Sequence, residues 1–412
     1  MKKLLLLGNN KHVDTLISLA KERGVYTIVT DNLSVEQSPC KLMADEYWDI
    51  NVTDIDLLEK KSIENDITAV LCGAGELCME ASRELCKRLR LPFYVSDRAW
   101  EVTNNKILFK NECIKCNIPV PKTYRIDISS DCNIPDDISY PVVVKPSDSC
   151  ASLGLHICET EKELIDGFKD AYEKSPSGEV VVEEFCRGTE FMLVYSFVNG
   201  KMTLVEHGEC YGDLKLGLPF IYCESPSKNI GLLTDRLTEP LKKLFAELDC
   251  KDGIAAIQGI LDKDKVSVFE MNYRLPGIDY VNSKYCCNIL LDFVLEDKMT
   301  NANRIAPEQK YIGYYIWLRK GRIETFKGLD IIKEEAAVLI YDLYKKTGDE
   351  IKENSGMRQI LLRILFDAEK ETIAHAFKVV NDNLVVLDEK GNDMAYRYDY
   401  MDGRFVLRKN GK

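Results

Sequence analysis

A lysine stands at the end of a strongly β-branched stretch, and a run of small residues follows it. Residues 141–155 read PVVVKPSDSCASLGL. The three valines predict a buried strand that delivers Lys145 into a loop containing Ser152 and Gly154. Serine and glycine let backbone N–H groups turn toward an anion, and the lysine adds a positive charge. The stretch indicates a phosphate site, and the alternative is a strand that ends at the surface in a turn.

A second stretch places three polar side chains at every other position of a predicted strand. Residues 266–277 read VSVFEMNYRLPG, with Glu270, Asn272 and Arg274 two residues apart. Residues two apart on a strand share a face, so these side chains are expected to point into one site. The alternative is ordinary surface polarity at a strand end.

Two further stretches also place charged residues near the end of a predicted helix or strand. NKILFK at 105–110 places Lys106 early in a predicted helix, where Lys110 is expected on the solvated face. VVVEEFCRGTEF at 180–191 is a strand that ends in carboxylates, with Glu190 seven residues after Glu183. The side chain of Glu184 is expected to be an exposed neighbour.

The elements that must position these residues begin with an alternation of strands and helices. Strands are predicted at 3–7, 25–29, 67–72 and 92–95, and helices at 12–23, 55–63 and 77–89. This order predicts parallel crossovers and a doubly wound α/β domain over residues 1–96. Ligands on such sheets bind beyond the carboxyl ends of the strands, where Glu76 is found. The GxGxxG pattern of dinucleotide-binding folds is missing at both glycine-containing strand ends.

The rest of the chain is predicted to be α+β with an antiparallel sheet. Asp97 is a candidate N-cap for a helix that runs to about Cys116, and Pro119 and Pro121 mark a linker. We predict a two-lobed unit over 97–305, with a central lobe at 119–186, and a small mixed domain over 306–412. Within them strands are predicted near 141–145, 179–184, 191–198, 202–206, 254–261, 265–271, 311–318, 337–344 and 383–387, and helices near 161–174, 231–248 and 367–380.

Composition limits the classes of partner. The 412 residues include 67 acidic and 55 basic side chains, for a net charge of −12, which disfavours nucleic acid. No apolar run is long enough for a signal peptide core or a membrane span, so we expect a cytoplasmic protein. The fifteen cysteines would then be reduced thiols. Cys113 and Cys116 form a CxxC pair, but no second pair completes a zinc pattern.

Taken in order along the chain, the four stretches resemble the ATP-grasp superfamily, in which nucleotide lies between two α+β lobes. Within it, the chain resembles carboxylate–amine ligases and the large subunit of carbamoyl-phosphate synthetase. The resemblance implies that Lys106 and Lys145 hold the α- and β-phosphates of ATP. It places Ser152 and Gly154 in a phosphate-covering loop.

The same resemblance implies a nucleoside site on residues 183–190. Glu183, with the backbones of Glu184 and Cys186, corresponds to the adenine clamp. Glu190 corresponds to the ribose ligand, since a carboxylate can accept from both hydroxyls.

A metal and phosphoryl-transfer site is implied next to it. Glu270 and Asn272 correspond to ligands of Mg²⁺ (or Mn²⁺), for which oxygen donors are suited. Arg274 corresponds to the residue that stabilises the transferred phosphoryl group, so Arg274 and Lys145 are the implied catalytic residues. Gln258 corresponds to a third metal ligand, at a position where many relatives carry an acidic residue, and its neutral amide oxygen would give the metal less charge.

The reaction implied is ADP-forming ligation, in which a carboxylate becomes an acyl phosphate that an amine captures. YYIWLRKGRIETFKGLD at 314–330 resembles the last domain of biotin carboxylase-like and amino-acid-ligase-like members. The expected partners are small-molecule carboxylate and amine substrates, with Glu76 as a candidate amine contact and a homodimer as one option. The alternatives are a bicarbonate-activating carboxylase, a carbamoyl-phosphate-type synthetase and a non-catalytic nucleotide-binding protein.

Overall fold

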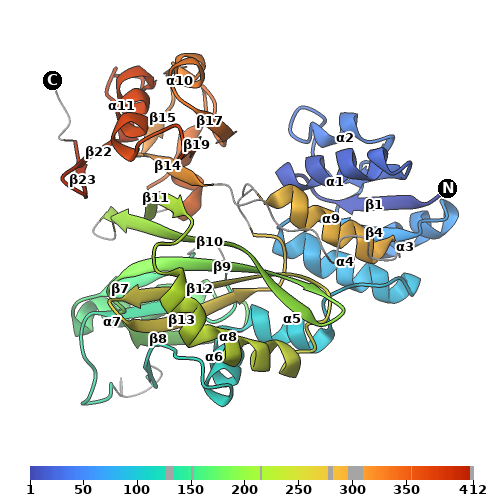
Figure 1. The fold of residues 1–412 in the computed structure, drawn as a ribbon, viewed down its shortest axis with the longest axis horizontal. Helices are drawn as coiled ribbons and strands as arrows, with labels where there is room; N and C mark the ends of the chain where they lie inside the picture. The colour runs from blue at the N-terminus through green and yellow to red at the C-terminus, as the bar shows by residue number, and fades with distance from the viewer. Residues whose placement is uncertain are drawn as a thin grey trace.

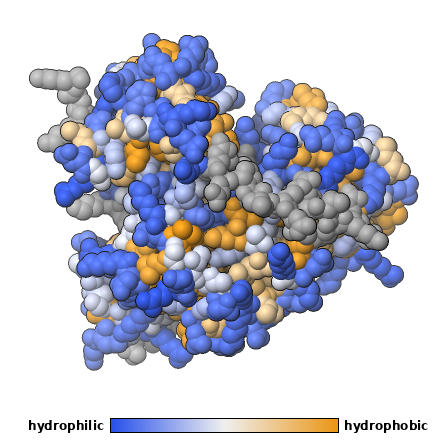
Figure 2. All heavy atoms as spheres, in the orientation of Figure 1, coloured by the Kyte–Doolittle hydropathy of each residue, from blue (hydrophilic) through white to orange (hydrophobic). Residues whose placement is uncertain are grey.

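The fold is known from a computed structural model (Figure 1). It describes residues 1–126, 134–149, 153–213, 216–276, 282–295, 310–353 and 355–408. Among these residues, no helix combines the length and the apolar character needed to cross a bilayer. Figure 2 shows hydrophilic residues over most of one face, with hydrophobic residues gathered near the middle of the view.

The N-terminal part is a parallel sheet with helices, which confirms the predicted fold class. Its strand order is β3-β2-β1-β4, formed by Glu46–Trp48, Tyr26–Thr30, Lys3–Leu7 and Ala69–Cys72. The connecting helices are α1 (Lys11–Glu22), α2 (Cys40–Met43), α3 (Ile55–Glu64) and α4 (Glu76–Leu89). In Figure 1 the sheet lies between α1 and α4. Leu4, Leu5, Leu6 and Leu7 are fully buried, as a strand covered on both faces requires.

Residues 92–95 do not form the predicted strand. Pro92 has no N–H to donate to a ladder, and the ring of Tyr94 is buried edge-on against Tyr273 instead, with centroids 5.7 Å apart. The apolar residues of this segment therefore join the N-terminal domain to the rest of the core.

The helix predicted from Asp97 to Cys116 is two helices. Ser96, not Asp97, caps α5 (Asp97–Asn104), because its side chain accepts from Ala99 N. Asn105 has an extended backbone and caps α6 (Lys106–Lys115) through Ile107 N and Leu108 N. The break makes Lys106 the first residue of a helix.

A small antiparallel sheet carries the first of the chemically interesting stretches. Its order is β5-β8-β6-β7, formed by Thr123–Tyr124, Val180–Glu184, Val142–Pro146 and His156–Cys158. The helix α7 (Glu161–Glu173) packs on it and shares its core. The predicted strands near 141–145 and 179–184 are thus direct neighbours.

A nine-stranded antiparallel sheet forms the largest element of the molecule. Along its main path the order is β13-β12-β9-β10-β11-β14-β19-β17, and β21 pairs with β14. The strands are Lys265–Asn272, Gly253–Asp262, Thr189–Val198, Lys201–Asp213, Leu218–Ser225, Tyr311–Leu318, Ile360–Asp367, Val338–Leu343 and Ala395–Tyr396. The pairing of β11 with β14 extends the sheet past residue 306. The helix α8 (Ile230–Glu247) adds five buried apolar side chains to the core, and α9 (Ser283–Val294) shares that core.

The remaining elements surround the far end of this sheet. They are β15 (Gly321–Arg322), β16 (Thr325–Lys327), α10 (Leu329–Glu335), β18 (Glu350–Ile351), η2 (Gly356–Gln359), α11 (Ile373–Asn383), β20 (Val385–Leu387), β22 (Tyr398–Met401) and β23 (Arg404–Leu407). Figure 1 shows this region and the N-terminal domain on the same side of the large sheet.

Candidate active site

Lys145 and Glu183 meet on neighbouring strands. Val143 of β6 lies opposite Glu183 of β8, so Lys145, two residues further along, shares its face. The Lys145 ammonium forms an ion pair with Glu183 Oε1. The other carboxylate oxygen accepts from Lys110 Nζ at 2.6 Å, and Lys110 also donates to Thr123 Oγ1 at 2.7 Å. One buried carboxylate is therefore held by two lysines.

Lys110 is not on a solvated helix face, so that expectation was wrong. It is 9% exposed and points into the small sheet. Burial alone would raise the pKa of Glu183, but Lys145 and Lys110 hold that pKa below its usual value. Burial in turn lowers the pKa of Lys110, against the opposing charge of Glu183. Because residues four apart share a helix face, the spacing from Lys106 to Lys110 was the signal that could have placed both lysines at one site.

Lys106 ties the start of α6 to the loop after β6. Its Nζ donates to Ser149 O at 2.7 Å, and its backbone N–H donates to Ser147 O at 3.0 Å. Gly154 has a φ of +74°, and a Cβ there would approach Pro146 Cγ to 3.0 Å, so glycine is required. Ser152 lies outside the described residues.

The segment implied as the adenine clamp begins with Glu183, near the end of β8. The half-exposed Glu184 carboxylate accepts from Lys122 N at 3.1 Å, and the backbone N–H of Glu184 donates to Lys122 O at 2.9 Å. The half-buried thiol of Cys186 lies 3.9 Å from the same carboxylate. Adenine binding by these backbones stays a prediction.

A chain of hydrogen bonds links the implied ribose and metal sites. Gln258 Nε2 donates to Glu190 Oε1 at 3.0 Å, and Asn272 Nδ2 donates to Gln258 Oε1 at 3.2 Å. Gln258 lies opposite Glu270 in the pairing of β12 with β13. Burial raises the pKa of Glu190 to about 7, and the charge of Glu270 adds to this, against the hydrogen bond from Gln258.

These contacts allow a test of whether a divalent cation fits. Asn272 gives its nitrogen to Gln258, so its amide oxygen is left to accompany the Glu270 carboxylate on the same strand face. No group of three or more His, Cys, Asp or Glu residues that could hold a metal occurs in the described part of the chain. A carboxylate with amide oxygens fits Mg²⁺, which keeps several waters or shares phosphate oxygens. Both ends of the Gln258 amide already bond to protein, and its role as a direct ligand stays a prediction.

Arg274 is reached by a residue from the N-terminal domain. Glu76 Oε1, at the first turn of α4, accepts from Arg274 Nη2 at 3.0 Å. A second nitrogen of Arg274 donates to Leu275 O at 3.2 Å. The structure thus brings Glu76 beside the arginine that follows Glu270 and Asn272.

The two cysteines of the CxxC pair lie elsewhere. Cys113 and Cys116 are both buried in the core as free thiols, at the end of α6. Their thiols have a raised pKa, chiefly because of burial, as is usual for structural cysteines.

Parts of this chain are similar in sequence to known proteins. A family model described as the D-ala D-ala ligase C-terminus matches residues 123–216. The chain is 24% identical over 307 residues to the carbamoyl phosphate synthase large chain of Pyrococcus furiosus, which covers 73% of this chain and 28% of that one. Other curated relatives are likewise matched over less than half of their length.

Solved structures of similar fold cover nearly the whole chain, among them an amino acid ligase and a carboxylase domain. The L-amino acid ligase from Bacillus licheniformis superposes with a TM-score of 0.75 and 18% identity, over 94% of this chain and 99% of that one. The biotin carboxylase domain of the Hydrogenobacter thermophilus 2-oxoglutarate carboxylase, solved with MgADP, ADP and bicarbonate, gives a TM-score of 0.73 and 17% identity, over 93% and 90%. The two structures show that the chain has the ATP-grasp fold, and the family model and the curated relatives confirm the resemblance in sequence.

Proposed function

We propose that the chain is an ATP-dependent ligase that joins a carboxylate to an amine and releases ADP and phosphate. The observation that carries this proposal is the meeting of Arg274 and Glu76 beside the face of β13 that bears Glu270 and Asn272. Phosphate-binding lysines, a cation site and an arginine for a transferred phosphoryl group are then present together. The family model and the similarity to the amino acid ligase structure support it.

In this proposal ATP lies between the small sheet and the large sheet. Lys106 and Lys145 contact its phosphates, which requires Lys145 to exchange Glu183 for a phosphate oxygen. Lys110 keeps Glu183 ionised and in place during that exchange, because it holds the other carboxylate oxygen. Glu190 accepts from the ribose hydroxyls once it is ionised.

The chemical step brings a carboxylate against the γ-phosphate. Glu270 and Asn272 would hold Mg²⁺, which would neutralise phosphate charge when bound. Arg274 stabilises the charge that develops on the transferred phosphoryl group, so two anions can meet. The amine then attacks the acyl phosphate, and phosphate leaves.

The test is ADP release from MgATP with pairs of amino acids and small carboxylates and amines. Release that requires both a carboxylate and an amine supports the ligase. Hydroxylamine in place of the amine should trap the acyl phosphate as a hydroxamate. ATP binding without turnover for every pair, or turnover that ignores the amine, would contradict the proposal.

One other activity has specific support. The carboxylase domain that superposes on the chain was solved with bicarbonate. Bicarbonate-dependent ADP release without an amine would favour a carboxylase. A purely nucleotide-binding role is disfavoured by the retained Glu270, Asn272 and Arg274 on one strand end.

The cellular location and the oligomeric state of the protein are also proposals. We expect a cytoplasmic location, because every cysteine among the described residues is a free thiol. A homodimer is proposed because the similar carboxylase domain was solved as a dimer, and sedimentation in solution tests it.

A further inference from the structure

Two cysteines lie side by side on neighbouring strands of the large sheet. Cys210 of β10 is directly opposite Cys223 of β11, and their sulfur atoms are 2.9 Å apart. Directly opposite residues of an antiparallel pair have Cα atoms about 4.5–5.5 Å apart, a separation that a disulfide accepts. The backbone therefore already has the geometry of a disulfide, and only the side chains must turn.

The strand on the other side of Cys223 leaves room for this pair. Gly313 of β14 is opposite Cys223, and a Cβ atom built there would lie 3.5 Å from Cys223 Cβ. Because glycine has no side chain, Cys210 supplies the side chain that faces Cys223 across its two neighbouring strands. Cys223 is 3% exposed and Cys210 is partly exposed, so a reagent reaches Cys210 first.

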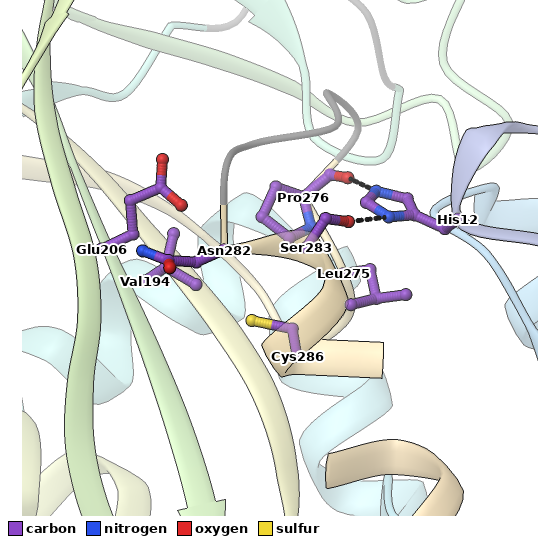
Figure 3. Close-up of a pocket in the computed structure, with 8 residues that line it drawn as sticks. All are labelled: His12, Val194, Glu206, Leu275, Pro276, Asn282, Ser283 and Cys286. Atoms are coloured by element: carbon purple, nitrogen blue, oxygen red, sulfur yellow. Dashed lines mark hydrogen bonds between the residues drawn. The ribbon is translucent and has the colours of Figure 1, made fainter. Parts of the chain in front are cut away.

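The cysteine pair lies on the sheet face that carries the candidate active site. Cys210 is directly opposite Glu190 of β9, the implied ribose ligand. Opposite residues of paired strands share a face, as Figure 3 shows four residues earlier along β10, where Glu206 lies beside Val194 of β9. A nucleoside bound to Glu190 would therefore cover the pair on the side of Cys210.

We propose that Cys210 and Cys223 are a modification site, at which a hydroperoxide forms a reversible disulfide and from which bound nucleotide excludes the oxidant. The second half of the statement depends on the nucleotide site of the proposed function. In a reducing compartment such a disulfide is transient, which suits a redox-sensing role.

The reaction proceeds in two steps that use one molecule of hydrogen peroxide. The Cys210 sulfur attacks a peroxide oxygen, the O–O bond breaks, and a sulfenic acid and water form. The Cys223 sulfur then attacks the Cys210 sulfur, the S–S bond forms, and the sulfenic oxygen leaves as a second water. The two thiols lose two electrons, which the peroxide accepts. A small-molecule dithiol restores both thiols by thiol–disulfide exchange.

The surroundings of Cys210 make this oxidation slow. The hydrogen bond with Cys223 and burial raise the pKa of Cys210 above the usual cysteine value. Because the thiolate is the attacking form, we expect the reaction to take minutes to hours at neutral pH. Nucleotide exchanges many times in that period, so the rate of oxidation reports the fraction of protein that is free of nucleotide.

The sequence makes the disulfide easy to detect. After free thiols are alkylated in denaturant, trypsin cuts after Lys201, Lys215 and Lys228 and gives peptides 202–215 and 216–228, with one cysteine each. After treatment with hydrogen peroxide we expect mass spectrometry to find these peptides joined, and dithiothreitol to separate them. Absence of the joined species, or joining of the two peptides to other cysteines as often as to each other, would overturn the modification site.

Variants locate the reaction at this pair. Cys210→Ala and Cys223→Ala should each abolish the joined species. Cys158→Ala is the matched control, because Cys158 is a buried free thiol on a strand of the small sheet, and this variant should form the disulfide at the wild-type rate. An equal loss in the control would refute the assignment. The wild-type digest decides the question even where a variant does not fold.

MgATP without a carboxylate tests the nucleotide half of the proposal. At about ten times Kd only about a tenth of the protein is free, so disulfide formation should slow about tenfold. Equal rates in protein that binds ATP by calorimetry would refute the exclusion by nucleotide and leave the modification site. Disulfide formation in a protein that binds no ATP would contradict the proposed function as well. Exclusion by ATP without ligase activity for any substrate pair would contradict the ligase alone.

Discussion

The buried carboxylate of Glu183 forms ion pairs with two lysines, Lys110 and Lys145. Replacing Lys110 therefore measures how much one of the two pairs contributes to stability. Lys110→Met should lower the free energy of unfolding by about 2–3 kcal/mol, because Glu183 keeps only Lys145 as a partner. Lys115→Met on the same helix is the control, since that lysine is exposed and should change stability by less than about 0.5 kcal/mol. Urea denaturation of the three proteins measures both values.

The sign of the pH dependence at Glu183 follows from its lowered pKa. The folded protein binds fewer protons there than the unfolded chain, so the stabilisation is full above the usual glutamate value of 4.5. It is lost as the pH falls from there through the lower pKa of the folded state. The wild type and Lys110→Met should therefore converge in stability on acidification. A constant difference down to the acid transition would contradict the ionised pair.

At Glu190 the pH dependence of stability has the opposite sign. Its pKa of about 7 means that the folded protein binds more protons there than the unfolded chain, so this group lowers stability as pH rises from about 4.5 to 7. Only the ionised form accepts from both ribose hydroxyls, so ATP affinity should rise as the pH increases through about 7. Glu190→Gln should abolish that pH dependence and shrink the discrimination against 2′-deoxy-ATP. Calorimetry between pH 6 and 8 measures both, and equal binding of the two nucleotides by the wild type would remove Glu190 from the ribose site.

At the scale of elements, the break between α5 and α6 positions Lys106, the lysine that we propose contacts a phosphate of ATP. Asn105→Ala removes the cap of α6 and should destabilise the protein by about 1 kcal/mol. Because Lys106 is the next residue, ATP affinity should fall as well. Thr160→Ala removes the equivalent cap of α7, with a similar loss of stability but no loss of ATP affinity. Equal effects of the two variants on ATP affinity would show that the break between the helices does not position Lys106 for ATP.

The position of β12 between β9 and β13 places Gln258 beside Glu190 of β9 and opposite Glu270 of β13. Gln258→Ala removes the link from Glu190 to Asn272, so the Mg²⁺ concentration for half-maximal activity should rise. Gln258→Glu adds a carboxylate facing the cation and should lower that concentration, while repulsion by Glu190 and Glu270 destabilises the metal-free protein. Identical Mg²⁺ titrations for both variants and the wild type would mean that Gln258 only fills its strand position.

At the scale of the whole molecule, α9 ties the large sheet to the N-terminal domain. Arg23, the residue that follows α1, donates to Asp292 at 2.6 Å and to Asn288 at 2.6 Å. Arg23→Met should lower the free energy of unfolding by about 2–3 kcal/mol, because Asp292 is 3% exposed and loses a cation. Lys21→Met, two residues earlier and within α1, breaks a solvated pair with Asp45 and should change the free energy of unfolding by about 1 kcal/mol or less. Equal, small effects in denaturation would show that the contact does not hold the domains together.

Local patterns were sufficient for most of the fold. Alternation of apolar strands and amphipathic helices predicted the parallel N-terminal sheet, and β-branched runs predicted β6, β8, β12 and β13 to within two residues. Two failures came from local chemistry that sequence patterns average over. Pro92 removes one backbone donor from residues 92–95, and Asn105 divides one predicted helix into two. Strand β11 and helix α9 were missed, although both are well populated with apolar residues.

The sequence by itself determined which residues carry charge at strand ends, because side-chain alternation and strand length are local properties. It could not determine which charges neutralise one another. Lys110 meets Glu183 across 73 positions, and Glu76 meets Arg274 across 198. Such pairs depend on how separate elements pack, because residues far apart in the sequence meet only where their elements touch. For Glu183 this packing also decides the pKa, which the charges of Lys145 and Lys110 hold below its usual value against the effect of burial.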